Sequence, residues 1–310
     1  LMKHLGLENY GQLVVALGDD LRYIDADYVG PELKTFPDGT WEGLWGERYE
    51  HYNFGEGEYP EACFLPYAGI EDVAKLDALR WPTADWWDYS KVRERAQATR
   101  DAGFIVFHGD AGQPDFMNGI ARCRGVEQVL IDVGEENEVW LELMRRRWQY
   151  FHDKQARMLE AADGLIDIMC FGEDLGNQNG LMISPRTFDK MFAGYFEKMF
   201  RLAHEHGAIT MMHSCGSCHD LIPRLIELGL DVLEVVQVDC ASMNIEQLHR
   251  EFYKKIAFCG SMSVQSTLPH GTVDDVVREV NLRKRLFKDG GMIIAPTHAI
   301  QVGTPLENIV

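Results

Sequence analysis

Short apolar runs alternate with amphipathic stretches along most of the chain. The apolar runs cover residues 103–110, 164–174, 207–215, 231–237, 256–261 and 290–296, and 21–30 is a further candidate. Each of the six later runs is almost continuously apolar, which is typical of parallel strands that are covered on both faces. The pattern therefore predicts a sheet of parallel strands.

The stretches between these runs carry the start and stop signals of helices. Ser184 is a good N-cap, and an apolar stripe of Phe, Tyr and Met residues follows it as far as Gly207. A second helix is predicted from Thr272 to about Lys288, and a longer one over 138–162. Six or more strand and helix units in succession predict an α/β protein with a closed barrel or a long open sheet.

The N-terminal third is less regular. Segment 31–84 is rich in Gly, Pro, Trp and Tyr, and linkers rarely carry so many aromatic residues. We expect this segment to be an excursion over the mouth of a barrel, within a single domain that spans residues 1–310.

Composition narrows the possible functions. The 49 acidic and 30 basic side chains give a net charge of −19, which disfavours binding to nucleic acid and to anionic membranes. No apolar run reaches the ~18 to 20 residues that cross a bilayer. Seven scattered cysteines are not a secreted disulfide framework, so we expect reduced thiols and a cytoplasmic protein.

Polar residues gather where the predicted strands end. They are His108 and Asp110, Glu173 and Asp174, His213 and Cys215, Gln237 and Asp239, Ser261 and Ser263, and His298 and Gln301. His213 and Cys215 are two residues apart, so both side chains point to one face of a strand, and both are favoured zinc ligands. Glu173 and His298 follow other strands and can complete a site.

Two other interpretations of this stretch stay open. A single His-x-Cys pair is more often a buried histidine beside an inert thiol. Cys215 and Cys218 also form a C-x-x-C motif between a strand and a helix, which is the setting of a thioredoxin-like redox site. The chain has more strand and helix units than that fold.

Three segments carry a family resemblance: "GEDLGNQNGLMISPRTFDKMF" (172–192), "HSCG" (213–216) and the run from "GSMSVQSTLPHG" to "THAIQVGTPLENI" (260–309). They resemble the uroporphyrinogen decarboxylase superfamily, and more closely its branch of corrinoid-dependent methyltransferases. The resemblance implies a single (β/α)8 TIM barrel. By comparison, the chain lacks the first strand before residue 1 and the last helix after Val310.

The resemblance also implies ligands. In the methyltransferase branch a His-x-Cys pair and a later cysteine bind zinc, and these positions match His213, Cys215 and His298, which stands in place of the cysteine. Glu173 resembles the next ligand or its partner. His108 and Asp239 are candidates for moving protons.

The leading hypothesis is a zinc-dependent methyltransferase that moves a methyl group between a small methylated substrate or thiol and a corrinoid protein. The first alternative is a cofactor-free decarboxylase similar to uroporphyrinogen decarboxylase. Its arginine-rich N-terminal segment is missing here, although Asp25 and Asp27 lie near the functional aspartate of those enzymes. The second alternative is a non-catalytic corrinoid or metal-binding protein.

Overall fold

Seven parallel strands form one continuous sheet in the computed structural model, which describes residues 1–55 and 57–310. In sheet order the strands are β1 (Leu21–Tyr23), β7 (Ile105–Pro114), β8 (Ile168–Gly172), β9 (Ile209–His213), β10 (Val232–Val235), β11 (Ala257–Met262) and β12 (Met292–Pro296). Every neighbouring pair is parallel. The six apolar runs and the candidate strand at 21–30 are thus confirmed as strands, and all seven end at the same edge of the sheet.

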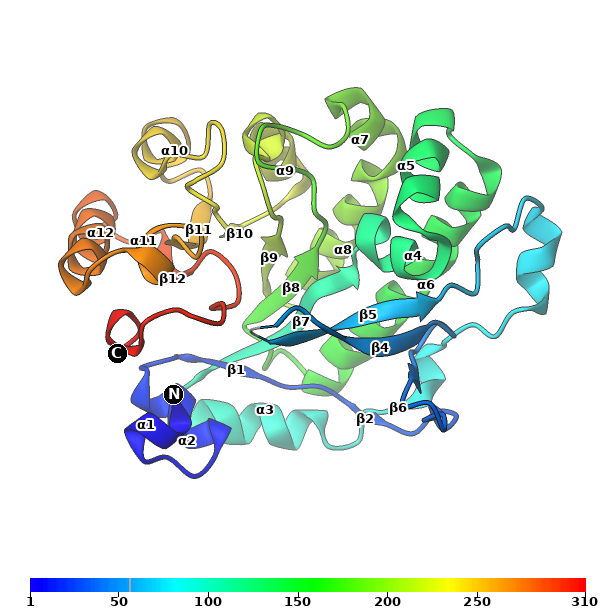
Figure 1. The fold of residues 1–310 in the computed structure, drawn as a ribbon, viewed down its shortest axis with the longest axis horizontal. Coiled ribbons are helices and arrows are strands. Elements are labelled where there is room, and N and C mark those ends of the chain that lie inside the picture. Colours follow the sequence, from blue (N-terminus) through cyan, green and yellow to red (C-terminus); the bar gives the residue numbers. More distant parts are fainter. Residues whose placement is uncertain (56) are drawn as a thin grey trace.

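Helices lie on the outer side of this curled sheet (Figure 1). They are α1 (Met2–Leu5), α2 (Tyr10–Ala16), α3 (Val92–Asp101), α4 (Phe116–Arg124), α5 (Val126–Glu135), α6 (Glu138–Ala162), α7 (Pro185–Met191), α8 (Ala193–Glu205), α9 (Ile222–Leu228), α10 (Ile245–Phe252), α11 (Thr267–His270) and α12 (Val273–Leu286), with 3-10 turns η1 (Val73–Ala78), η2 (Ala84–Trp86), η3 (His219–Leu221) and η4 (Leu306–Asn308). The architecture is a curled, seven-stranded parallel half-barrel with outer helices, consistent with a (β/α)8 TIM-like fold. Among the described residues β1 and β12 are the two edges of the sheet and do not pair with each other.

The predicted helices are confirmed with one correction. Helix α6 matches 138–162, and α12 begins with a capping box between Thr272 and Asp275. The single helix expected from Ser184 to Gly207 is wrong, because two helices, α7 and α8, meet at Phe192. Phe192 keeps helix-like dihedral angles (φ −111°, ψ −43°) and stays buried, so the apolar stripe continues across the break.

Two apolar layers hold the strands. Side chains inside the curl include Ile168, Cys170 and Met211, whereas their neighbours Phe171 and Met212 pack outward against the helices. Successive strand residues point to opposite faces, so a strand that is covered on both faces, such as β8, is apolar along its whole length. This double coverage explains the continuous apolar runs in the sequence.

Two small antiparallel sheets lie at the base of the N-terminal excursion and within it. They are formed by β2 (Asp27–Tyr28) with β6 (Trp87–Asp88), and by β3 (Trp41–Glu42), β4 (Arg48–Asn53) and β5 (Glu58–Phe64). Tyr59 on β5 donates a hydrogen bond of 2.8 Å to Gln301, in the loop that follows β12. The excursion therefore contacts the loop that follows β12. That 31–84 covers the mouth and that 1–310 is one domain stay predictions.

No helix among the described residues is both long enough and apolar enough to cross a membrane.

Candidate metal centre

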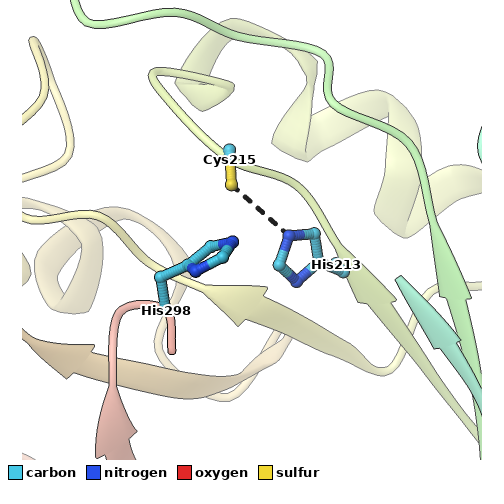
Figure 2. Close-up of side chains that lie close together, drawn as sticks. All are labelled: His213, Cys215 and His298. Atoms are coloured by element: carbon cyan, nitrogen blue, oxygen red, sulfur yellow. Dashed lines mark hydrogen bonds between the residues drawn. The ribbon is translucent and has the colours of Figure 1, made fainter. Parts of the chain in front are cut away.

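Three ligand-type side chains meet at the ends of β9 and β12. His213 is the last residue of β9, Cys215 lies two residues later, and His298 lies in the loop after β12. One ligand atom from each lies within 4.8 Å of the other two, and Figure 2 shows the His298 ring directed toward the other pair. His213 is buried, Cys215 is half-buried and His298 is exposed, so the group is open to solvent on one side.

Close approach of two loops fixes the position of Cys215. Gly216 has a φ of +77°, and a Cβ there would lie 2.3 Å from the backbone of Gly176 in the loop after β8. The Ser217 N–H donates to the Asn177 carbonyl across the same contact, at 2.8 Å. Only glycine combines this dihedral angle with this spacing, so the two glycines allow the loops after β8 and β9 to touch.

A carboxylate on the neighbouring strand orients His213. Glu234 stands opposite His213 in the β9 and β10 register, and the His213 Nδ1 donates to its Oε2 at 3.0 Å. The other ring nitrogen, Nε2, lies 3.4 Å from the Cys215 Sγ. Histidines that bind metals usually donate their second N–H to a carboxylate in this way, which fixes the ring and its tautomer.

Asp174 is the second carboxylate beside the group. Its Oδ1 accepts the Cys215 N–H at 2.8 Å and lies 3.8 Å from the His213 Nε2. Its Oδ2 accepts from the Asn118 side chain at 2.7 Å. Asp174 therefore holds the backbone that carries Cys215.

The charge state of the group follows from these contacts. Burial opposes protonation of His213, but the hydrogen bonds with Cys215 and Glu234 outweigh it and raise the pKa of His213 to about 10. Burial raises the pKa of the Cys215 thiol, and the charge of Asp174 adds to this rise. Without a bound cation, the site therefore holds protons that a metal would displace.

The donor set fits zinc. Zinc takes imidazole nitrogen at ~2.0 to 2.1 Å and thiolate sulfur at ~2.3 Å with tetrahedral angles, which puts two such donors about 3.5 Å apart. The separation of 3.4 Å between His213 Nε2 and Cys215 Sγ agrees with that value. Three protein donors with one open side is the arrangement of catalytic rather than structural zinc sites.

Glu173 does not belong to this group among the described residues, contrary to the sequence-based expectation. It is fully buried, and its two oxygens accept the Phe116 and Met117 N–H groups at 2.7 and 3.0 Å, at the start of α4. Burial, with the nearby charge of Asp115, raises the pKa of Glu173 well above its usual range. Its geometry is that of a carboxyl group that caps a helix.

The two expected proton carriers also lie elsewhere. His108 is fully buried: its Nδ1 donates to the Ile24 carbonyl at 2.9 Å, its Nε2 has no hydrogen-bond partner among the described residues, and burial lowers its pKa. Asp239 accepts hydrogen bonds from Ser263 and Ser266, which join the loops after β10 and β11. Neither residue is part of the histidine and cysteine group.

The structure also bears on the redox interpretation. Cys215 and Cys218 are both free thiols in the structure. Cys218 is fully buried at the start of η3, and burial raises the pKa of its thiol to about 12. A redox dithiol needs a nucleophilic thiol with a lowered pKa, which in a C-x-x-C motif is the first cysteine, and burial raises the pKa of Cys215 instead.

Comparison with known proteins gives the family. The family model described as uroporphyrinogen decarboxylase (URO-D) matches residues 97–310, more than half of the chain. The fold is similar to that of a solved methyltransferase from Methanosarcina mazei, with a TM-score of 0.62 and 16% sequence identity over 96% of this chain and 80% of that chain. No curated protein sequence matches. The chain belongs to the uroporphyrinogen decarboxylase family.

Proposed function

We propose that this protein is a zinc-dependent methyltransferase that moves a methyl group between a small methylated substrate or thiol and a corrinoid carried by a partner protein. The observation that carries this proposal is the convergence of His213, Cys215 and His298 within 4.8 Å at an open strand-end face. The fold shared with a protein named as a methyltransferase supports it. The cytoplasm is the compartment that we propose for both proteins.

Each residue has a task in this proposal. His213, Cys215 and His298 hold the zinc, and Glu234 keeps the His213 ring in the tautomer that presents Nε2. Bound zinc supplies Lewis-acid chemistry, which keeps a thiol as its thiolate or makes the oxygen of a methyl ether a better leaving group. The exposed side of the group, beside His298, is where the substrate and the corrinoid would approach.

A decarboxylase is the second candidate, and one observation favours it. Asp25, just after β1, accepts hydrogen bonds from Tyr23 at 2.9 Å and from the buried Lys154 at 2.8 Å. A carboxylate in such a network at the end of a barrel strand is a plausible catalytic group. The zinc-type donor set has no role in a cofactor-free decarboxylation, so we rank this candidate second.

Methyl transfer from free methylcob(III)alamin, which substitutes for the corrinoid protein, tests the proposal. The zinc-loaded protein is given a panel of thiols and phenols, and loss of the methylcobalamin spectrum is followed. We expect zinc-dependent transfer that Cys215→Ser abolishes and that Cys63→Ser, a change at an exposed thiol, leaves intact. Release of CO2 from uroporphyrinogen without any methyl transfer would favour the decarboxylase. Zinc binding without either activity would favour a non-catalytic metal-binding protein.

A further inference from the structure

A pocket of about 320 Å³ lies at the amino ends of β10, β11 and β12, at the opposite end of the strands from the metal group. Its wall is formed by the residues at the starts of these strands: Asp231, 253–257 and 289–291. A pocket of this volume accommodates a small molecule. The proposed methyl transfer makes no use of this end of the sheet.

Basic side chains surround this pocket. Lys254 and Lys255 line it directly, just after the end of α10. The end of α12 lies beside them, because the Phe287 ring packs against the rings of His249 and Tyr253, with centroids 5.0 and 6.0 Å apart (Figure 1). The exposed cations of these two helix ends are Arg250, Lys254, Lys255, Lys284, Arg285 and Lys288.

The favourable interaction of cations with helix C-termini explains only one of these six side chains. The Lys255 Nζ donates to the Glu251 carbonyl at 2.8 Å. The other five have no hydrogen bond or ion pair within the described part of the chain, and the ion pairs nearby are those of His219 with Glu251 and of Arg283 with Glu279. The net charge of the chain is −19, but carboxylates more than about 10 Å away are largely screened. The local charge around the pocket is therefore positive.

The backbone of the pocket wall adds hydrogen-bond donors. The N–H groups of Lys254, Asp289 and Gly291 have no acceptor among the described residues, whereas the Gly290 N–H donates to the Phe287 carbonyl at 3.0 Å. Gly290 and Gly291 have φ values of +96° and +92°, which other residues rarely adopt. Unpaired N–H groups beside ammonium groups form a concavity that favours an anion.

The backbone conformation of Lys254 points the same way. Its φ is +64°, in the left-handed region that lysine adopts only at a cost. This is a position after a helix end, where glycine is the favoured residue. Residues held in such conformations cluster at ligand sites, where the strain is tolerated for function. A lysine at this position therefore indicates that its charge is used.

Two carboxylates also line the pocket. The Asp231 Oδ2 accepts the Thr210 N–H at 2.9 Å and lies 2.7 Å from the His204 Nε2, so α8 and β9 engage this group. Asp289 is exposed and has no ion pair among the described residues, so it reduces the positive charge by one. The six cations outnumber the two carboxylates, and removal of the Asp289 charge should favour an anion further.

We propose that this pocket binds a small phosphate monoester. The phosphate group carries close to two negative charges near neutral pH and has three oxygens that accept hydrogen bonds in several directions. Lys254 and Lys255 supply the opposite charge, and the unpaired N–H groups supply directed donors. The Tyr253 ring lines the same pocket and would contact the organic part of the ligand. Binding here is independent of the metal group and of methyl transfer.

Phosphate esters are titrated into the full chain by calorimetry, with and without zinc. The probes are AMP and glycerol 3-phosphate, and their uncharged analogues are adenosine and glycerol. We expect saturable binding of both esters, unaffected by zinc and at least about ten-fold tighter than binding of the analogues. Tighter binding of AMP would identify a ligand whose ring packs on Tyr253, and equal affinities would identify recognition of the phosphate alone; either result supports a phosphate site.

Two variants should change the affinity for these esters in opposite directions. Lys254→Gly removes the ammonium group and the strained conformation together, so it should weaken binding about ten-fold without lowering the melting temperature. Asp289→Asn removes the opposing charge and should tighten binding about three-fold. Lys34→Gln, at an exposed lysine of the N-terminal excursion, is the control and should change neither affinity nor melting temperature.

Three results would overturn the proposal. They are absence of saturation at about 10 mM of either ester, equal affinity for an ester and its uncharged analogue, and ester binding that neither Lys254→Gly nor Asp289→Asn changes. The pocket and the metal group lie at opposite ends of the strands, and no methyl transfer is measured. Failure here is therefore distinct from failure of the methyltransferase proposal.

Discussion

Removal of the Glu234 carboxylate should weaken zinc binding without unfolding the protein. The His213 Nδ1 donates to Glu234 at 3.0 Å, and an imidazole bound to zinc gains positive character that this carboxylate stabilises. Coulomb's law at that distance gives about 1.4 kcal/mol in water and about 5.5 kcal/mol at an effective dielectric constant of 20. Because the Glu234 side chain is 27% exposed, the low end applies. Loss of such partners typically costs about 10- to 100-fold in metal affinity.

We therefore expect zinc affinity to fall roughly 30-fold in Glu234→Ala and roughly 10-fold in Glu234→Gln, whose amide oxygen can still accept the Nδ1 proton. Competition against a chromophoric zinc chelator at fixed pH measures both values. Glu205→Gln, an exposed change at the end of α8, is the control and should leave affinity unchanged. Unchanged affinity in Glu234→Ala would show that the contact with His213 does not support a metal.

Three further changes probe the surroundings of the site. Tyr59→Phe removes the hydrogen bond to Gln301, three residues after His298, and should weaken zinc binding by up to about ten-fold, whereas Tyr52→Phe on the same hairpin should not. Gly216→Ala forces a side chain into a left-handed conformation and should lower both the melting temperature and the zinc affinity. Asp115→Asn should raise the melting temperature above that of the wild type by more at pH 7.5 than at pH 4.5. Burial raises the Asp115 pKa from 3.8 to about 6, so the wild type loses up to about 3 kcal/mol as the pH rises through that window. Equal melting shifts at both pH values would contradict this.

The sheet was predictable because its central strands, such as β8, are buried on both faces and are therefore largely apolar. That requirement makes a run such as 207–215 visible in the sequence, and it places His213 and Cys215 at a strand end. The proximity of His298 followed from the rule that parallel strands end at one edge. The break at Phe192 was not predictable, because the apolar stripe runs through it unchanged.

Glu234 and Asp174 contact the metal group, but the sequence analysis did not predict either of them as a residue of the site. Glu234 lies inside an apolar strand, and the sequence "DVLEVVQ" does carry a signal, since a lone charge in a buried strand needs a partner. Asp174 and Glu173 are adjacent carboxylates after one strand, and sequence cannot say which of them points toward Cys215. The opposite faces of neighbouring residues decide this: Glu173 turns to the start of α4 and Asp174 to the metal group.

Zinc content of the purified protein tests the central claim most directly. Mass spectrometry of metals after gel filtration should find about one zinc ion per wild-type chain. The same measurement should find about one in Cys63→Ser, and close to none in Cys215→Ser and in His298→Ala, with all variants folded by circular dichroism. Zinc content that stays the same in Cys215→Ser, or that is absent from the wild type even after incubation with excess zinc, would contradict the account.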